Sequence, residues 1–586
     1  MKIKHFFGLA VIAAMTASCS SNEDLGNAGP GTGTNEAGVG YATFTINLPS
    51  VSGTRAADAG GAEMNEGTED EYAVKSATAL IFQKYGADEG SNKFVESVTL
   101  PVDGWTKDAK DDGITTTSKK LVAKLTNVDT KNDYSVLILL NNTKVALPTV
   151  GQSYNDWNSK NILTPSVTDW TGSDGFYMAN APLKGSGASP AILVPINKDK
   201  IYASEAIAKE DASECAATVF VERGVAKMSV ADPTPTDPIK VKDKATKAET
   251  ESTVKFNNWA LDITNKKTYA VHNIDGLESD FGDIWKTDPS NRFIGTNNRV
   301  YWGKDPNYDN KDLKLTDKDA ERQAEFNFIT ATSQIDKDFA NTTKTNPVYC
   351  LENTFNLTNM YQGQTTRVIF KAKYAPKDDA GNSLADDDET FYTIGNMTTI
   401  LNTNKLKAAV NAVANPVLPA GYTIDYTNFM TKEGSHVITL ADIKDADDKP
   451  LVAGTDYSGK TGTVIVDEIN TKLGLTDGGG RAEAKVGINT YLQGVTYYIA
   501  RVKHFGDALT EWKSGESYGD NNKQYLGRYG MLRNNWYELT VGNVYGPGYP
   551  GVPPVDPTLP DDENEKYLSV SVKILSWAKR SQKIDL

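Results

Sequence analysis

Short segments in which apolar and polar residues alternate recur along the whole chain of 586 residues. Clear examples are ATALIFQKY (77–85), TTRVIFKAKY (365–374) and NWYELTVGNV (535–544). Because successive side chains of a β-strand point to opposite faces of its sheet, this period of two is typical of strands buried on one side. Turn-forming residues separate the segments, and the chain contains 48 glycines and 24 prolines. The pattern therefore predicts a mainly β protein built from antiparallel strands.

The length of the chain and the breaks in this pattern predict two β-sandwich domains in series. Boundaries are placed where apolar periodicity gives way to proline, glycine and charge. The expected parts are 1–19 (signal peptide), 20–55 (tether and N-terminal strand), 56–231 (N-terminal sandwich), 232–251 (linker), 252–544 (C-terminal sandwich), 545–566 (proline-rich linker) and 567–586 (terminal strand). Short helical inserts are expected at DKDAERQAEF (317–326) and TNKLKAAVNAVA (403–414).

The first residues of the chain, MKIKHFFGLAVIAAMTASCSS, have the composition of an export signal. Lys2 and Lys4 form a basic start, and the apolar run that follows is too short to span a bilayer. Small residues then precede Cys19, which resembles a bacterial lipobox and predicts lipidation of Cys19. The alternative is an ordinary signal peptide with an incidental cysteine. The other two cysteines, Cys215 and Cys350, are expected to be unpaired buried thiols.

Two segments near the ends of the chain share one strand pattern. Four apolar residues alternate with polar ones in each segment: Ala42, Phe44, Ile46 and Leu48 in YATFTINL (41–48), and Leu568, Val570, Val572 and Ile574 in YLSVSVKI (567–574). A lone strand cannot bury its apolar face, so the C-terminal segment needs a sheet to join. A strand of similar pattern and volume can replace another in a sheet. The C-terminal strand could therefore replace the N-terminal strand of a neighbouring molecule, or both strands could stay in their own chain.

Arg55 is the only lysine or arginine between Cys19 and Lys75, and it lies in a stretch rich in Gly, Ser and Ala. Such a loop is accessible to proteases. Cleavage between Arg55 and Ala56 would remove both the lipid and the N-terminal strand, and would expose an apolar groove with unpaired backbone groups. A strand from a neighbouring molecule could fill this groove, and repetition of that contact would produce a filament.

The sequence contains no arrangement of residues expected of an enzyme, and no catalytic residue, cofactor or metal site is predicted. None of His272, His436 and His504 lies at ligand spacing from another His or Cys, and all three are expected to be surface or packing residues. The acidic segments 305–312 and 378–389 lack the spacing of an EF-hand loop and are expected to be solvated rather than to bind calcium. The formal net charge of −15 argues against a nucleic-acid partner.

Two further segments need a structural interpretation. GTDYSGKT (454–461) has the spelling of a P-loop, but the β-branched residues of TVIVDEI (463–469) predict a strand after it, whereas a P-loop requires a helix. We therefore interpret the segment as a turn between two strands. RYGMLRNNWYEL (528–539) predicts a strand preceded by a turn or bulge at Arg533 and Asn534, with a structural rather than a catalytic role.

Several segments resemble the fimbrillin family of Bacteroidia, the major subunits of type V pili. The most specific are YYIARVKHFGD (497–507), RYGMLRNNWYELTVGNVYGPGYP (528–550) and LSWAKRSQKIDL (575–586). Further similar segments are VERGVAKMSV (221–230), FNNWALDITNKKTY (256–269), YCLENTFN (349–356) and TTRVIFKAKY (365–374). The resemblance thus extends over both expected domains and the C-terminal tail.

The resemblance implies two transthyretin-like sandwich domains and a lipoprotein precursor acylated at Cys19. It further implies cleavage between Arg55 and Ala56 by an arginine-specific protease, and replacement of the N-terminal strand by the C-terminal strand of another copy. The implied partners are other copies of the subunit, anchor and tip or accessory pilins, and the outer membrane before processing. The implied location is a fimbria on the outer-membrane surface, where it supports adhesion.

The donor strand departs from simple alternation after Ile574, because the apolar residues shift to Leu575 and Trp577. This shift predicts a bulge or bend between two short parts of the strand. The alternative function is a monomeric surface lipoprotein that binds glycan or a host protein. An anchor, accessory or tip pilin is a further alternative.

Overall fold

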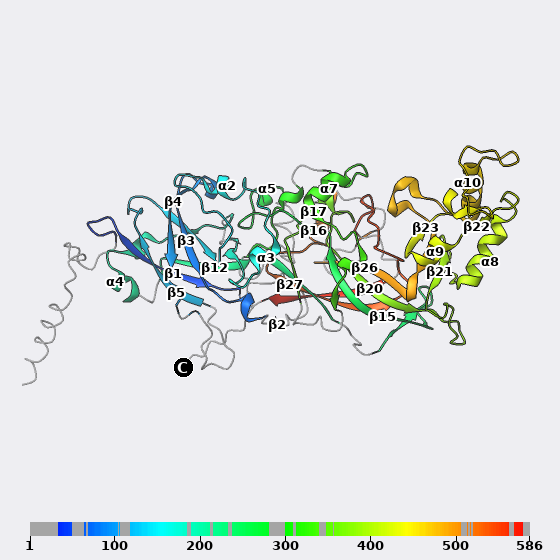
Figure 1. The fold of residues 1–586 in the computed structure, drawn as a ribbon. Helices are drawn as coiled ribbons and strands as arrows, with labels where there is room; N and C mark the ends of the chain where they lie inside the picture. Colours follow the sequence, from blue (N-terminus) through cyan, green and yellow to red (C-terminus); the bar gives the residue numbers. More distant parts are fainter. Residues whose placement is uncertain are drawn as a thin grey trace, which may run out of the picture.

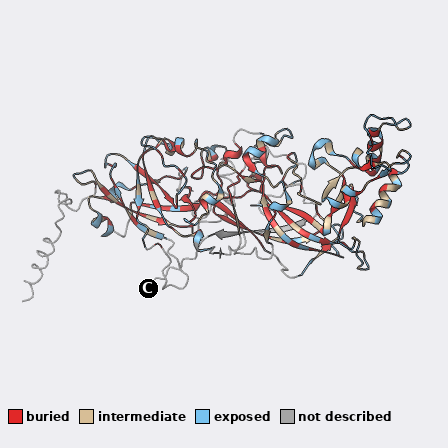
Figure 2. Cartoon of the chain, in the orientation of Figure 1, coloured by how far each residue is buried: buried red, intermediate tan, exposed pale blue. Residues whose placement is uncertain are grey.

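The protein is an elongated, mainly β molecule (Figure 1). The computed structural model describes residues 33–49, 64–65, 68–103, 105, 118–184, 189–210, 215–231, 237–280, 299–308, 312–338, 347–354, 357–504, 512–513, 516, 520–561 and 568–577. Buried residues follow the strands from the first sheet through the middle of the molecule (Figure 2). Within the described residues, no helix is both long and apolar enough to cross a membrane.

The N-terminal half is built around one sheet of nine strands. Its main path is β11 (Ile201–Tyr202), β1 (Gly40–Asn47), β12 (Ala217–Arg223), β7 (Met178–Asn180), β6 (Tyr134–Leu140), β3 (Ala77–Gln83) and β4 (Lys93–Leu100), with β5 (Ser118–Leu125) paired to β1 and β10 (Val194–Pro195) paired to β6. The strand β12 pairs with β1 along its first half and with β7 along its second half. It therefore connects the two parts of the sheet around a common core.

The middle of the molecule, called the second sandwich, consists of two five-stranded sheets packed face to face. One sheet has the order β19 (Val348–Leu351), β13 (Val225–Ala231), β27 (Asn535–Val544), β28 (Leu568–Trp577) and β2 (Met64–Asn65). The other has the order β14 (Ile239–Lys242), β15 (Glu249–Asp262), β20 (Arg367–Ala375) and β26 (Val495–Arg501), with β18 (Lys337–Asp338) paired to β15. Met228, Leu539 and Phe370 are among the residues that fill the core between these sheets.

The boundary between the halves differs from the sequence-based prediction. The segment 225–231 was expected to close the N-terminal domain, yet β13 pairs with β19 and β27 of the second sandwich. The expected linker 232–251 also contributes strands, since β14 lies within it and β15 begins at Glu249. Charged residues in this segment obscured its β-pattern, because β14 is an edge strand and β15 extends beyond the core into solvent.

The sheets are not purely antiparallel. Among the described strands, three pairs are parallel: β1 with β12, β13 with β27, and β2 with β28. Smaller two-stranded sheets and short helices complete the surface of both halves. They are β8 (Leu183–Lys184) with β9 (Pro190–Ala191), β16 (Thr264–Asn265) with β17 (Phe326–Asn327), α2 (Tyr154–Trp157), α3 (Val167–Trp170), α4 (Glu205–Glu210), α5 (Leu277–Asp280) and α7 (Asp319–Glu325).

Residues 376–494 form an inserted module between two neighbouring strands, β20 and β26, at the end of the molecule opposite β1 (Figure 1). Its elements are β21 (Phe391–Ile394), α8 (Thr403–Ala414), β22 (Thr423–Ile424), α9 (Thr427–Thr431), β23 (Gly434–His436), β24 (Ile443–Lys444), α10 (Gly462–Leu473) and β25 (Ile488–Tyr491). Leu406, Phe429 and Ile469 belong to a hydrophobic core of its own. The predicted helical inserts are confirmed as α7 and α8.

The prediction of a strand after GTDYSGKT is wrong, because Gly462–Leu473 is the helix α10. The side chain of Thr461 caps its first turn, and Gly474 ends it at a φ of 70°. Its buried residues recur at helical spacing and pack on the core of the inserted module, which outweighs the low helix propensity of β-branched residues. Lys460, the lysine of the P-loop-like segment, forms an ion pair with Glu468 of α10.

The separate core of the inserted module predicts that it can be destabilised alone. Phe429→Ala should cost about 3–5 kcal/mol, because the ring is fully buried and its removal leaves a cavity. Hydrogen exchange should accelerate in 376–494 and stay unchanged in the nine-stranded sheet. Val464→Ala is the control, since Val464 is 48% exposed and should change stability by no more than about 0.5 kcal/mol. Equal acceleration throughout the chain would contradict a separate module.

Candidate functional site

The N-terminal strand β1 is an interior strand of its sheet. It pairs with β5 along all eight residues, and on its other edge it pairs with β11 at Tyr41 and Ala42 and with β12 from Phe44 onward. The apolar residues predicted for one face are all buried in the core: Ala42, Phe44, Ile46 and Leu48. Removal of β1 would leave unpaired backbone groups on both sides of an apolar groove.

Side chains on the opposite face of β1 also contact the sheet and its surroundings. The Thr43 hydroxyl donates to the carbonyl of Ala208 in α4 at 2.7 Å, and the Asn47 amide donates to the carbonyl of Val219 at 3.3 Å. Each buried aliphatic or aromatic side chain contributes roughly 1.5–3 kcal/mol to stability. These contacts hold β1 firmly in its sheet.

The C-terminal strand β28 lies in the second sandwich of its own chain. It is antiparallel to β27, with Val570 opposite Val541 and Val572 opposite Leu539, and its far end pairs with β2 (Figure 1). β28 thus extends a sheet whose inner face covers the core of the second sandwich. In the single chain, β28 therefore pairs within its own subunit and does not extend away from it.

The predicted break after Ile574 is not present. The register continues without a shift from Ile574 opposite Tyr537 to Leu575 opposite Trp536, and the irregularity lies between Val541 and Val544 of β27. The reason is that both faces of the sheet are covered at this end. Tyr537 is buried in the core of the second sandwich, whereas Trp536 is buried in the core that continues into the first sheet. The paired strand β27 is thus buried on both faces here, and β28 continues beside it without a register shift.

The proline-rich segment after β27 also differs from the prediction of a free linker. Residues 545–561 lie against the second sandwich, where Tyr549 and Tyr497 exchange backbone hydrogen bonds of 2.7 and 2.9 Å. Asp561 is buried and forms an ion pair with Arg501 at 3.7 Å. The connection between β27 and β28 is thus packed up to Asp561.

A buried group of charged residues joins the first sheet to the second sandwich. Glu222, at the end of β12, accepts a hydrogen bond from Arg299 and contacts Nδ1 of His272 at 2.8 Å. Burial alone would raise the pKa of Glu222, but the charges of Arg299 and His272 outweigh it and lower the pKa to about 2. The chain passes from β12 to β13 immediately after this residue, so the group fixes the point at which one sheet gives way to the next.

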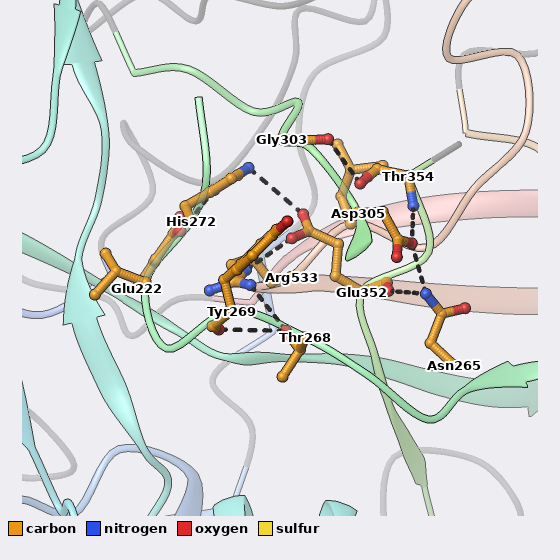
Figure 3. Close-up of polar contacts among 12 residues, drawn as sticks. Glu222, Asn265, Thr268, Tyr269, His272, Gly303, Asp305, Glu352, Thr354 and Arg533 are labelled. Atoms are coloured by element: carbon orange, nitrogen blue, oxygen red, sulfur yellow. Dashed lines mark hydrogen bonds and ion pairs between the residues drawn. The ribbon is translucent and has the colours of Figure 1, made fainter. Parts of the chain in front are cut away.

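Glu352 and Arg533 form a second pair in the same group (Figure 3). Arg533 Nε donates to Glu352 Oε2 at 2.9 Å, and its Nη2 donates to the Thr268 hydroxyl at 3.3 Å. His272 Nε2 lies 3.6 Å from Glu352 Oε1, which links the two pairs. The predicted turn at Arg533 and Asn534 is confirmed by the φ of 61° at Asn534, and the buried contacts of Arg533 support its structural role.

Asp305 corrects the prediction of a solvated loop over 305–312. It is buried and accepts hydrogen bonds from the amide of Asn265 at 2.5 Å and from the backbone of Thr354 at 3.1 Å (Figure 3). Burial raises the pKa of its carboxyl to about 7. Both Asp305 oxygens are used by donors of the protein, since Asn307 satisfies the other oxygen. The site therefore stabilises a loop.

The segment that follows the predicted cleavage site is anchored to the same region. Glu71 is fully buried and pairs with Lys227 of β13 at 2.7 Å, and it accepts a hydrogen bond from the Tyr349 hydroxyl. Burial lowers the pKa of Lys227 to about 8, although the charge of Glu71 opposes this effect. Arg223 donates to the Glu71 carbonyl at 2.6 Å. The chain is thus attached to the second sandwich before it returns to the first sheet as β3.

Other predicted residues are not brought together into a site. Cys19, Arg55 and Ala56 lie outside the described residues. Cys350 is buried, and burial raises the pKa of its thiol to about 12, whereas Cys215 is only partly buried and thus differs from the prediction. His272 and His504 are both buried; His272 belongs to the charged group around Glu222, and His504 contacts the Tyr537 hydroxyl.

No metal centre is formed by the residues that the structure describes, among which no group of three His, Cys, Asp or Glu side chains converges. The acidic segment 378–389 contains a turn in which Asp378 accepts hydrogen bonds from Ala380 and Asn382. The buried charges of Glu222, Glu352 and Asp305 were missed in the sequence. The available signal was the pair of charged residues Glu222 and Arg223 between two apolar segments, 216–221 and 225–230.

The buried ion pairs between the first sheet and the second sandwich predict that replacing one charged partner by a neutral residue lowers the stability of the protein strongly. Glu222→Gln should destabilise the protein by about 3–5 kcal/mol, because the buried ion pair between Glu222 and Arg299 is lost. Asp133→Asn is a matched control, since Asp133 pairs with Lys198 at the surface and should cost no more than about 1 kcal/mol. Urea unfolding of both variants measures the difference, and equal effects would contradict a stabilising junction.

The low pKa of Glu222 also predicts the pH dependence of this difference. A carboxyl whose pKa is lower in the folded state stabilises fully above its unfolded pKa of about 4.3 and loses this contribution as the pH falls. The stability gap between the wild type and Glu222→Gln should therefore be constant above about pH 5.5 and shrink as the pH falls toward 2. A gap that grew on acidification would contradict the assignment.

Comparison with known proteins gives a family for the C-terminal part of the chain. Residues 489–583 match the family model described as "Major fimbrial subunit protein type IV, Fimbrillin, C-terminal". A candidate cell adhesion protein from Parabacteroides distasonis aligns at 10% identity over 92% of this chain and 99% of that chain, with a TM-score of 0.37. A fimbrial assembly protein from the same organism aligns at 12% identity over 40% of this chain and 67% of that chain, with a TM-score of 0.21. These TM-scores are too low to support an argument, and no curated protein gives a significant match.

The family match includes the strands β26, β27 and β28 and the proline-rich segment between the last two. It therefore covers most of the three segments on which the resemblance mainly rested: 497–507, 528–550 and 575–586. The resemblance is confirmed by this match. Residues 489–583 are thus similar to the C-terminal part of the fimbrillin major fimbrial subunits.

Proposed function

We propose that this protein is a structural subunit of a cell-surface fimbria and supports adhesion. In this proposal the precursor is exported as a lipoprotein acylated at Cys19, and an arginine-specific protease cleaves it between Arg55 and Ala56. The subunits then polymerise by donor-strand exchange, with anchor and tip or accessory pilins at the ends of the fibre. The N-terminal nine-stranded sheet and the second sandwich are taken as the two transthyretin-like domains of the family. The family match of 489–583 supports a fimbrial role.

The position of β1 is the observation that carries the exchange mechanism. The strand is bordered on both edges, its apolar face is buried, and the proposed cleavage site follows it in the sequence. Loss of this strand creates a groove that requires an amphipathic replacement. The alternation of Leu568, Val570, Val572 and Ile574 has the matching period, and Leu575 and Trp577 extend the proposed donor.

The pairing of β28 with β27 adds a step to this proposal. The donor strand must leave its own sheet before it can enter the groove of a second copy, because one strand cannot pair in both places. Deletion of 567–586 is therefore an ambiguous test, since it also removes a strand of the second sandwich. A covalent lock of β28 onto β27 avoids this difficulty.

The lock can be made with Thr540→Cys and Ser571→Cys, which are direct partners across β27 and β28. Partners in an antiparallel pair have Cα atoms about 4.5–5.5 Å apart, which a disulfide can bridge. The oxidised, processed subunit should remain monomeric, and the same protein should polymerise after reduction. Each single cysteine variant is a control for the substitutions. Equal polymerisation of the oxidised and reduced forms would show that 568–577 is not the donor.

The mature N-terminus tests the processing step. Fibres from cells should consist of subunits that begin at Ala56, because the proposed cleavage removes β1 before the groove can be filled. Edman degradation or mass spectrometry of purified fibres measures this end. Subunits that begin at acylated Cys19 and remain monomeric would favour a surface lipoprotein that binds its ligand without polymerising.

A further inference from the structure

Three charged residues form a buried row across one end of the second sandwich. Asp262 of β15 is the register partner of Arg367 of β20, and Arg367 is the register partner of Arg501 of β26. All three are at most 5% exposed. Arg367 Nε donates to Asp262 Oδ2 at 2.8 Å. The row contains two cations and one anion, so further acceptors are needed to compensate the buried charge.

The proline-rich segment supplies these acceptors. The carbonyl oxygens of Pro553 and Pro554 accept hydrogen bonds from Arg367 at 2.8 and 3.2 Å. Asp561 lies 3.7 Å from Arg501 and accepts a hydrogen bond from the Thr365 hydroxyl. With Asp561 included, the buried row has two positive and two negative groups. The segment is therefore part of the charge balance of the sandwich rather than a spacer beside it.

Backbone contacts hold the same segment along the loop before β20. The Gln362 backbone N–H donates to the carbonyl of Leu559 at 2.9 Å, and its side-chain amide donates to the carbonyl of Pro560 at 3.2 Å. The Asp561 N–H donates to the carbonyl of Met360 at 3.2 Å. These bonds lie next to the pair of Asp561 and Arg501, so charge and backbone contacts fix the chain at one place.

We propose that Asp561, held by Arg501 and Thr365, sets the point at which the C-terminal tail leaves the subunit, and that Asp561 and Arg367 are positioning residues for subunit assembly. This inference rests on the proposed strand exchange. The partner that it concerns is a second copy of this chain, and the residues act on the location of the donor strand rather than on its contacts in the groove.

The anchor limits the distance over which one subunit can engage the next. An extended chain spans at most about 3.5 Å per residue, so a tail that leaves at Val544 could place Leu568 up to roughly 80 Å away. A tail that leaves at Asp561 can place Leu568 no more than roughly 25 Å away. A short tether raises the effective concentration of the strand at a site within its reach and excludes sites beyond it. The anchor therefore favours one spacing between subunits.

The test uses the processed full-length subunit with Asp561→Asn and, separately, Thr365→Val. Each change removes one contact of the anchor and leaves both β1 and β28 intact. Amide exchange at Leu559 and Asp561 should become at least about tenfold faster in both variants. Their fibres should elongate at least about tenfold more slowly, and the axial spacing measured by electron microscopy should be broader than in the wild type.

Asp556→Asn is the matched control, because Asp556 makes the same kind of contact within a local turn, to the backbone and hydroxyl of Thr558. It should behave as the wild type in both measurements. Unchanged exchange in Asp561→Asn would overturn the anchor, and faster exchange with unchanged fibre growth and spacing would overturn its positioning role. A processed wild type that forms no fibres would instead overturn the proposed function on which this role rests.

Discussion

The buried charges between β12 and the second sandwich are the interaction on which the rest of the molecule depends. The chain crosses from one sheet to the other immediately after Arg223, and Glu222, Arg299 and His272 surround this crossing. Arg533 and Glu352 extend the same group toward β27. Paired buried charges impose strict geometry, because a shifted partner leaves an uncompensated charge in a medium of low dielectric constant. The two halves are thus joined as one body, with the groove strand β1 in one half and the tail strand β28 in the other.

Sequence patterns predicted the strands well where one face of a sheet is buried. YATFTINL and NWYELTVGNV both form the expected strands, and the four apolar residues of the first segment all enter the core. The patterns failed where tertiary packing determines the outcome. TVIVDEI is helical because its apolar residues also fit a helical spacing and meet a core on one side. The strand β13 follows β12 after Gly224 alone, and no break in composition marks the change of sheet.

The candidate site was only partly accessible to prediction for the same reason. The resemblance in 528–550 identified the region of Arg533, but its partner Glu352 is distant in sequence. Asp305 lies in a segment predicted to be a solvated loop, and Asp561 lies in a segment predicted to be a linker. Both predictions were made because acidic and proline residues are usually exposed. Their burial depends on donors from other strands, such as Asn265 and Arg501. Only the assembled sheets bring these partners together.

The position of β28 changes the energetic description of the proposed assembly. A tail free in solution would gain the whole free energy of burial when it entered a neighbouring groove. A tail that already pairs with β27 first loses those backbone hydrogen bonds, so the net gain is smaller than for a free tail. While β1 occupies its position in the first sheet, no groove is open to a donor strand, and β28 stays paired with β27 of its own chain. In the proposed mechanism, proteolytic loss of β1 would be irreversible and would leave the larger defect, an interior gap with two unpaired edges. Departure of β28 would expose one edge of β27 and free the two-residue strand β2. Under the proposed mechanism, processing therefore sets the direction of the exchange, and the anchor at Asp561 sets where it occurs.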